Sequence, residues 1–407
     1  MAIGDVIVGI DIGSSKLGLV VGEVNNFNQV QILCNTKKKS NGIQKGEIVD
    51  ENALAGCISD LIKEAQKEIN VKINSAYITI PGRFVTIVQN SVEKEAKDKY
   101  SGISSRDIQQ ALIQASNIEV PEGKQVIDIV TNNFILDNGK STNDPVGAFS
   151  NKFTLNAQII LGEKDYLRQL YNVFKKANVD IDGIVPITLA EKNIILDEAD
   201  QKDSVMLIDI GAQNTDYGIF DGQNFIYTNG IPVGGQSITN DLSIVLDISG
   251  EEAEKLKKQY NLALKSYIEN DQDVVLNTAR GDKKVVKSSN VVEIIEARVE
   301  QIFDLINKDI SSKGLKTNIN TIVLAGEGIT NISKSDIVAK ITFNIPVKLA
   351  SNKAVEYTPN AYITAFGLVR YIASRPFTKN VSSSYDVDSK EGVFKKILSR
   401  IKEFFYS

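Results

Sequence analysis

The chain has 407 residues, an ordinary apolar content of 42% and a formal net charge of −5. It contains no histidine, which excludes the Ser-His-Asp triad and every other histidine-dependent mechanism. Its two cysteines have no metal-ligand spacing, so a zinc site is excluded too. The last sixteen residues carry four basic side chains and one acidic one, which leaves −8 on the rest of the chain. Such an acidic body argues against a general nucleic-acid binder.

The length exceeds what one hydrophobic core supports, so two or more lobes are expected. The first residues enter a strand without a preceding basic stretch, so no signal peptide is predicted. No apolar run in the sequence approaches the ~20 residues of a membrane span. These features predict a cytoplasmic protein whose cysteines are reduced.

The first predicted element is a β-hairpin over Val6–Val24, in which two apolar runs flank the polar turn Gly13-Ser14-Ser15-Lys16. A helix is expected over 50–69, because apolar residues recur there at helical spacing. A strand follows at 75–81. A mixed segment from about 85 to 162 contains its own helix over 105–116.

The hairpin then recurs in the second half of the chain. The segment Val205–Phe220 repeats the Asp-Ile-Gly of Asp11–Gly13 at Asp209–Gly211, 198 residues later. One such turn is ordinary, but two in near-equivalent places predict a duplicated fold with two facing lobes.

Further turns and helices follow in order. Gly234-Gly235 precedes a helix expected from near Ser237, and a charged helix covers 251–260. A long amphipathic helix is predicted over 291–310, and a buried strand within 319–332 ends in Gly326-Glu327-Gly328. The small-residue helix over 359–373 suits close packing. A polar linker follows over 376–391.

The last sixteen residues, 392–407, predict an amphipathic helix. Two sets of side chains would contact a membrane surface, one apolar and one basic. The apolar face consists of Val393, Phe394, Ile397, Leu398, Ile401, Phe404 and Phe405, and the basic residues are Lys395, Lys396, Arg400 and Lys402. The alternative is a terminal helix packed on the body.

The repeated turns have the chemistry of a phosphate site. A turn of small residues after a strand exposes successive backbone N–H groups to an anion. Gly13, Ser14 and Ser15 can do this in the first hairpin, and Lys16 adds a positive charge. Asp11 and Asp209, at the strand ends, would hold Mg²⁺ through its waters. The alternative for any single loop is an ordinary turn capped by an aspartate.

The order of these motifs resembles the actin, Hsp70 and sugar-kinase superfamily, and within it the FtsA family of bacterial cell-division proteins. The segments that carry the resemblance are GIDIGSSKLGLVVGEV, SNGIQKGEIVD, AYITIPG, DPVGAFSNKFTLNAQII, IPVGGQSITNDLS and EEAEKLKKQY, followed by the polar linker and terminal helix. It covers nearly the whole chain. The implied fold is α/β, an actin-like two-lobed ATPase fold with duplicated ribonuclease-H-like cores.

The resemblance also implies a division into subdomains. Subdomain 1A would comprise 1–84, 166–192 and 362–375, with a family-specific subdomain 1C over 85–165. Subdomain 2A would comprise 193–228 and 305–361, with 2B over 229–304. The linker and the membrane-targeting helix would complete the chain.

The resemblance implies Mg-ATP as ligand, with Asp11 and Asp209 at the metal. Glu254 and Lys257 match positions near the nucleoside, although both also fit the solvated face of a charged helix. The nucleotide-binding set would be Asp11, Gly13, Ser14, Ser15, Lys16, Asp209, Gly211, Ala212, Gln213, Asn214, Thr215, Gly234, Gly235, Glu254, Lys257, Gly326 and Gly328. Two departures stand out, namely side chains at Ala212 and Gln213 where the family has glycines, and Glu327 between two glycines.

Active relatives place a glutamate in the stretch that corresponds to 186–196, where it positions the attacking water. Pro186 falls at that place here, with Glu191 further along the helix, so absent or slow hydrolysis is expected.

The implied function is an ATP-binding protein that polymerises and tethers FtsZ filaments to the cytoplasmic face of the membrane at the division site. Its partners would be FtsZ, further copies of itself, anionic lipid and other division proteins, with no nucleic acid. The alternatives are a PilM-like assembly protein, a small-molecule kinase and an Hsp70-like chaperone. A chaperone would need a substrate domain beyond the ATPase, and a kinase has no use for a tethered tail.

Overall fold

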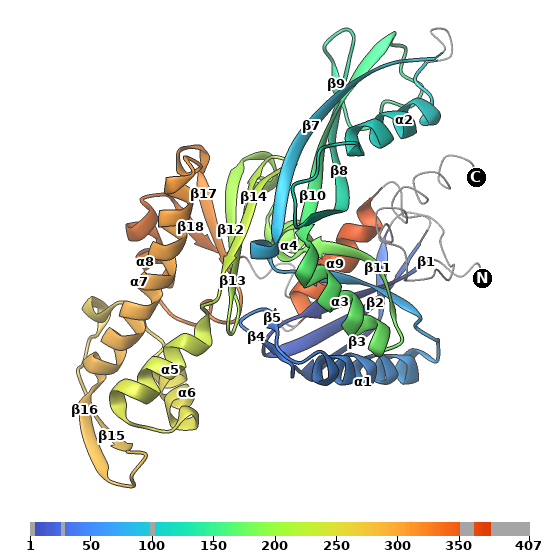
Figure 1. The fold of residues 1–407 in the computed structure, drawn as a ribbon. Helices are drawn as coiled ribbons and strands as arrows, with labels where there is room; N and C mark the ends of the chain where they lie inside the picture. Colours follow the sequence, from blue (N-terminus) through green and yellow to red (C-terminus); the bar gives the residue numbers. More distant parts are fainter. Residues whose placement is uncertain (1–4, 26–28, 98–101, 351–361, 376–407) are drawn as a thin grey trace.

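The computed structural model describes residues 5–25, 29–97, 102–350 and 362–375, and all structural statements concern these ranges. Two lobes lie side by side: lobe I contains β1, and lobe II contains β12. A smaller unit stands out above lobe I (Figure 1). The predicted linker and terminal helix, with all the expected membrane-contacting residues, lie outside the described residues. None of the helices in the described ranges combines the length and apolarity that a bilayer span requires.

Lobe I is built on a five-stranded sheet in the order β11-β6-β1-β2-β3. The strands β1, β2 and β3 are antiparallel, whereas β6 and β11 run parallel to β1. Full pairing of β1 with β2, in which Asp11 lies opposite Gly18, confirms the predicted first hairpin. The bounds are β1 Asp5–Ile12, β2 Lys16–Val24, β3 Val30–Lys39, β6 Ser75–Ile80 and β11 Asp180–Pro186.

Lobe II repeats this sheet. Its order is β14-β13-β12-β17-β18, with three antiparallel strands followed by two parallel ones. The second Asp-Ile-Gly strand, β12, therefore takes the central place that β1 has in lobe I, which confirms the predicted duplication. The bounds are β12 Ser204–Ile210, β13 Thr215–Asp221, β14 Asn224–Ile231, β17 Thr321–Ala325 and β18 Val347–Leu349.

Helices cover both faces of the lobe I sheet (Figure 1). Helix α1 begins where the Asp50 carboxylate accepts the backbone N–H groups of Asn52 and Ala53, and it ends at Asn70 in the left-handed conformation. Its apolar face, from Leu54 to Ala65, is buried. Helices α4 and α9 cross on the other side, in the core that both sheets share. The bounds are α1 Glu51–Ile69, α3 Lys164–Lys176, α4 Ile187–Ile195 and α9 Ile363–Ser374.

Lobe II carries its own helices and a two-stranded sheet. Helix α5 begins at Gly235, two residues before the predicted Ser237, and α7 is longer at both ends than predicted. The apolar faces of α5, α7 and α8 pack with β12 and β17 into a second core. The bounds are α5 Gly235–Leu246, α6 Gly250–Gln259, β15 Asp273–Asn277, β16 Lys283–Lys287, α7 Ser288–Ser312 and α8 Ser335–Phe343.

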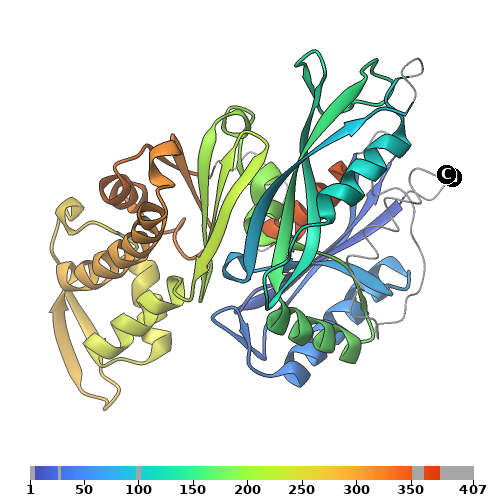
Figure 2. The same cartoon turned by 45° about the horizontal axis from the view of Figure 1, so that its top comes forward.

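The third unit is a four-stranded sheet in the order β7-β10-β8-β9, covered by α2 (Figure 2). It has a separate apolar core, and polar contacts join it to both lobes. The Gln158 side chain exchanges two hydrogen bonds with the backbone of Phe225 in lobe II. The Arg375 guanidinium, after α9, binds the buried Asp128 carboxylate through both its oxygens. The bounds are β7 Val85–Glu95, α2 Ser105–Ser116, β8 Lys124–Leu136, β9 Ser141–Thr142 and β10 Lys152–Glu163.

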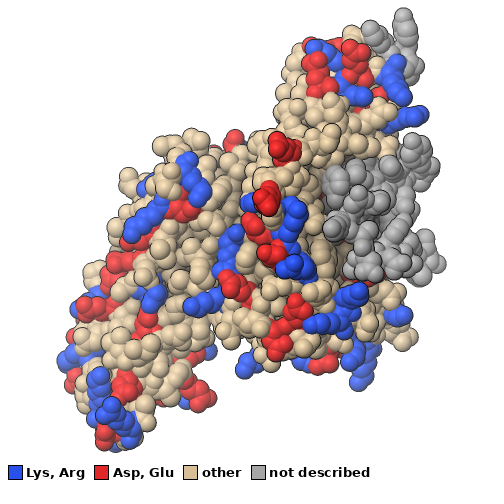
Figure 3. Space-filling view, in the orientation of Figure 1, with Lys and Arg blue, Asp and Glu red and all other residues tan. Residues whose placement is uncertain are grey.

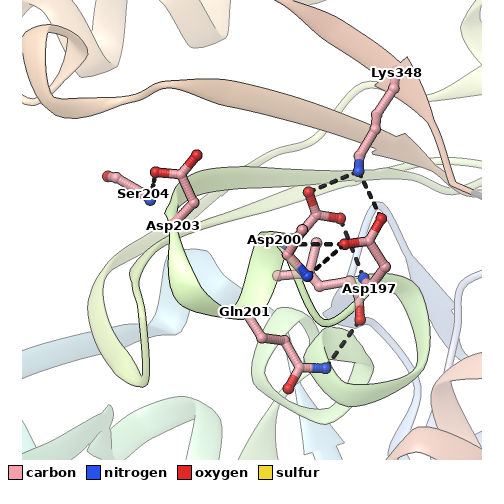
Figure 4. Close-up of polar contacts among 8 residues, drawn as sticks. Asp197, Asp200, Gln201, Asp203, Ser204 and Lys348 are labelled. Atoms are coloured by element: carbon pink, nitrogen blue, oxygen red, sulfur yellow. Dashed lines mark hydrogen bonds and ion pairs between the residues drawn. The ribbon is translucent and has the colours of Figure 1, made fainter.

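The loop that follows α4 is fixed to the edge of the lobe II sheet. Lys348 on β18 binds the Asp200 and Asp197 carboxylates at 2.7 Å and 3.0 Å, and Asp197 also caps the turn that contains Asp200 (Figure 4). Helix α4 therefore leaves a strand of lobe I at one end and is tied to lobe II at the other. This makes it a structural bridge between the lobes.

Candidate functional site

The two Asp-Ile-Gly strands bring Asp11 and Asp209 to equivalent ends of the two central strands. The Thr79 hydroxyl on β6 donates to the Asp11 carboxylate at 2.9 Å and accepts the backbone N–H of Ile12. Burial raises the pKa of Asp11, although Thr79 and the charge of Lys16 partly offset this effect. Asp11 is thus oriented by its own sheet.

Asp209 lies close to other acidic side chains. Its cross-strand neighbour on β13 is Asp216, a buried carboxylate. Burial, together with the charges of Asp216 and Asp11, raises the pKa of Asp209 to about 7. Burial also raises the pKa of Asp216 to about 6. Buried carboxylates that raise one another's pKa values in this way are typical of a functional site.

Asp216 also holds the two lobes together. It accepts the backbone N–H of Gly82 from lobe I at 2.6 Å and the Asn214 amide at 2.5 Å. The lobe I loop at Gly82 approaches β14 so closely that an added Cβ would lie 2.4 Å from the Thr228 hydroxyl. Asp216 was absent from the predicted site. Its position directly opposite Asp209 in the hairpin is the signal that would have found it.

Three loops of lobe II are in direct backbone contact beside Asp209. They contain Gly211, Gly235 and Gly328. The Gly235 N–H donates to the Gly211 carbonyl, and the Gly328 N–H donates to the Ile210 carbonyl at 2.8 Å. A Cβ at Gly328 would lie 2.3 Å from the Gly211 carbonyl oxygen, so no side chain fits there. Gly326 has a φ of +92°, which glycine adopts without strain. The predicted glycines are therefore needed for this stack.

The second predicted phosphate-binding turn, which departs from the family pattern, folds without strain. Neither Ala212 nor Gln213 has a positive φ, so the side chains at these positions are compatible with the backbone. The Thr215 hydroxyl donates to the Val233 carbonyl at 2.8 Å and ties this hairpin to the segment before α5.

A small hairpin of lobe I, β4 (Ile43–Gln44) and β5 (Glu47–Ile48), bridges both phosphate turns. At its tip the Gly46 N–H donates to the Ser14 hydroxyl at 2.8 Å. The neighbouring Lys45 N–H donates to the Gln213 side chain of lobe II at 2.9 Å. The two turns, 198 residues apart in sequence, are thus joined through one tip.

Lys16 forms an ion pair across the lobes with Glu327, at 2.8 Å. Both side chains are partly exposed, and Glu327 lies between the two close-packed glycines after β17. The glutamate that departs from the family pattern therefore points toward the predicted phosphate-binding lysine.

Glu254 and Lys257 form a compact network with α5. Lys257 binds the Glu254 carboxylate at 2.7 Å, the Thr239 hydroxyl at 2.8 Å and the Gly235 carbonyl at 3.2 Å. The Lys257 side chain is only 15% exposed. The alternative of two solvated helix residues is therefore wrong for Lys257, which contacts the glycine loop.

Glu191 is the second residue that the predicted site missed. It is buried on α4, and burial together with the charge of Asp209 raises its pKa well above the usual range. The charges of Asp11 and Asp216 act in the same direction. The signal in the sequence is the charged pair Glu191-Lys192, in a helix whose other residues are apolar apart from Thr188 and Asn193.

The structure thus brings together most of the predicted residues. The junction of the lobes is lined by Lys16, Asp11, Ser14, Gln213 and Asp209. The two turns, the loop before α5 and the loop after β17 meet there too. On the face shown in Figure 3, acidic and basic side chains are interspersed over both lobes.

Solved structures of known proteins share this architecture. A PilM–PilN type IV pilus biogenesis complex superposes with a TM-score of 0.58, at 13% identity and over 89% of this chain and 97% of the other. MreB5 of Spiroplasma citri bound to ADP superposes with a TM-score of 0.54, at 14% identity, over 88% and 94%. The duplicated sheets, the crossing helices and these likenesses define an actin-like ATPase fold.

Sequence comparisons give the family. Residues 206–367 match the family "Cell division protein FtsA", and residues 68–161 match "SHS2 domain inserted in FTSA". The cell division protein FtsA of Bacillus subtilis (strain 168) is 26% identical over 367 residues, covering 89% of this chain and 82% of the relative. The chain belongs to the FtsA family of cell division proteins.

Proposed function

We propose that this protein binds Mg-ATP between its lobes, polymerises, and tethers FtsZ filaments to the cytoplasmic face of the membrane at the division site. The observation that supports nucleotide binding best is the convergence of two Asp-Ile-Gly turns and two glycine loops on one junction. The family supports the role in division.

The residues at the junction suit a magnesium nucleotide. The two phosphate turns would donate backbone N–H groups to the phosphates, and Lys16 would exchange Glu327 for a phosphate oxygen. The glycine stack would let the adenosine approach the backbone, next to Lys257. Among the described residues no group of three or more acidic or cysteine side chains is arranged to hold a metal ion directly. Asp11 and Asp209 would therefore hold Mg²⁺ through its waters.

ATP hydrolysis is proposed to be slow. Pro186 stands where active relatives place the water-positioning glutamate, and it begins α4 without a side-chain donor or acceptor. Loss of an oriented water removes much of the proximity contribution to catalysis. Steady-state turnover should stay below ~1 s⁻¹, the low end for enzymes.

Membrane attachment is proposed to reside in 392–407. Its basic residues would each contribute roughly 1 kcal/mol near anionic lipid, and its apolar face would enter the interface. A single such helix binds weakly and reversibly. In a polymer the tails act together, so the attachment becomes strong through avidity. Subdomain 2B, over 229–304, is the proposed docking region for FtsZ, on the family resemblance alone.

Flotation with anionic vesicles tests the tether. FtsZ should float only when the wild-type chain and ATP are both present. The Ile401→Glu variant, or deletion of 392–407, should abolish flotation and leave ATP binding intact. A tail variant that floats as well as wild type would show that the helix belongs to the folded body. Changes confined to 229–304 that leave FtsZ co-pelleting would refute the docking region.

The likeness to the PilM–PilN complex raises a pilus-assembly role as the rival. The family matches over both 68–161 and 206–367 favour division instead. A membrane-binding helix on the chain would also favour the division role, because a PilM-like protein would not ordinarily need its own membrane helix.

A further inference from the structure

Glu191 is held rigidly where α4 crosses α9. The close approach of the helices depends on Gly367, at which an added Cβ would lie 2.4 Å from the Ala190 carbonyl oxygen. From the same helix, the Thr364 hydroxyl donates to Oε1 of Glu191 at 2.7 Å. One carboxylate oxygen is therefore fixed, and with it the direction of the other.

That other oxygen, Oε2, has no hydrogen-bond partner among the described residues, although Glu191 is only 2% exposed. A buried carboxylate oxygen without a donor is costly, so such a group usually marks a missing ligand or water. The charged groups that act on it are Asp209 on β12, Asp11 on β1 and Asp216 on β13, all of them acidic. A ligand that donates a hydrogen bond and brings positive charge would satisfy this oxygen and offset the negative charge of these carboxylates.

Building on the proposed function, we propose that Glu191 is a positioning residue for hydrated Mg²⁺, and that its Oε2 accepts a hydrogen bond from a water of the ion's shell. Mg²⁺ gives up its waters reluctantly, so carboxylates often reach it through them. A shell water supplies the missing donor, and the ion neutralises the carboxylates that surround it. Glu191 would then join Asp11 and Asp209, from a third element, in fixing the ion.

The variant Glu191→Gln tests this directly. Glutamine keeps the length of the side chain and an oxygen for Thr364, but it removes the charge. Binding of a fluorescent ATP analogue is measured at one pH, in EDTA and in rising free Mg²⁺. In wild type Mg²⁺ should tighten binding, and in Glu191→Gln this enhancement should fall about tenfold, as expected for a lost hydrogen bond to a charged group. Binding in EDTA should be unchanged or tighter.

One further variant tests the same role from the other side of the hydrogen bond, and another serves as a control. Thr364→Val removes the donor that fixes Oε1, so it should reduce the Mg²⁺ enhancement in the same direction by a smaller factor. Glu51→Gln removes a carboxylate that pairs with Lys176 on the surface of lobe I, and it should bind like wild type. Thermal melts of all variants establish that each is folded.

The outcomes separate the two levels of the proposal. A wild type that binds no analogue, with or without Mg²⁺, overturns the proposed function and the Glu191 role together. A Mg²⁺-dependent wild type with an unchanged enhancement in Glu191→Gln and Thr364→Val overturns the Glu191 role alone. Equal weakening of Glu191→Gln binding in EDTA and in Mg²⁺ would indicate a purely structural role and would also overturn it.

Discussion

At the residue scale, buried carboxylates at the junction of the lobes repel one another. Asp11, Asp209, Asp216 and Glu191 all have raised pKa values, with burial as the largest cause of each. Lys16 is the cation that opposes this repulsion at Asp11 and Asp209. Such an arrangement weakens the folded protein unless protons or a cation neutralise it.

This repulsion predicts a pH dependence of stability. The pKa of Asp209 is about 7 in the folded chain, against 3.8 for the ordinary carboxyl, so between these values the folded state binds more protons than the unfolded one. Stability of the nucleotide-free protein should therefore fall as pH rises from about 5 to 7.5. Calorimetry without Mg²⁺ should give a higher melting temperature at pH 5.5 than at pH 7.5.

The variant Asp209→Asn should flatten that dependence and raise the melting temperature at pH 7.5, because it removes one of the repelling charges. Glu47→Gln, at an exposed carboxylate, should keep the wild-type slope. A melting temperature that rises between pH 5.5 and 7.5 in the wild type would contradict this account of the site.

At the element scale, α4 and α9 pack closely in the core that both sheets share. Gly367→Ala should destabilise the protein by at least 1–3 kcal/mol, the usual cost of overpacking, because its Cβ would lie 2.4 Å from the Ala190 carbonyl oxygen. Gly56→Ala, on α1 with nothing within 4 Å of the added Cβ, is the matched control. It should stabilise the helix by about 0.5–1 kcal/mol. Urea unfolding that ranks Gly367→Ala at or above wild type would refute the close crossing.

A second element-scale contact joins the third unit to α9. The Asp128 carboxylate is buried, and Arg375 donates to both its oxygens at 2.7 and 2.8 Å. Removing one partner of a buried pair leaves an uncompensated charge and costs about 3–5 kcal/mol. Arg375→Met should therefore lower the free energy of unfolding by about that amount.

The double variant Asp128→Asn/Arg375→Met removes both charges, so it should recover part of the loss. The shortfall from additivity measures the coupling between the two side chains. If Arg375→Met costs less than about 1 kcal/mol in urea unfolding, the pair does not fix the third unit on the body.

At the scale of the whole molecule, the sequence allowed the duplicated fold to be predicted because the hairpins at Asp11 and Asp209 repeat both pattern and position. The glycine loops followed from their order along the chain. Asp216 and Glu191 were missed because their roles depend on cross-strand register and on a helix crossing. The hairpin position of Asp216 and the charged pair Glu191-Lys192 point to the site only once this packing is known. Lys257 stayed ambiguous for the same reason, because its partners lie on α5.

The proposed polymer, FtsZ contact and membrane attachment are whole-molecule properties that would depend on nucleotide binding at the junction. The lobes contact each other through hydrogen bonds at Gly82 and Lys45 and through the Lys16–Glu327 ion pair. A nucleotide that engages both phosphate turns would compete with the ion pair and bias the position of the lobes. ATP binding is therefore the claim on which the others depend.

Isothermal titration of the full chain with ATP at pH 7.5, with and without Mg²⁺, measures this binding. Wild type should bind one ATP, more tightly with Mg²⁺, whereas Asp209→Asn should lose the Mg²⁺-dependent part and still unfold cooperatively, at or above the wild-type melting temperature. The absence of binding by wild type at millimolar Mg-ATP, or equal Mg²⁺-dependent binding by Asp209→Asn, would contradict the account.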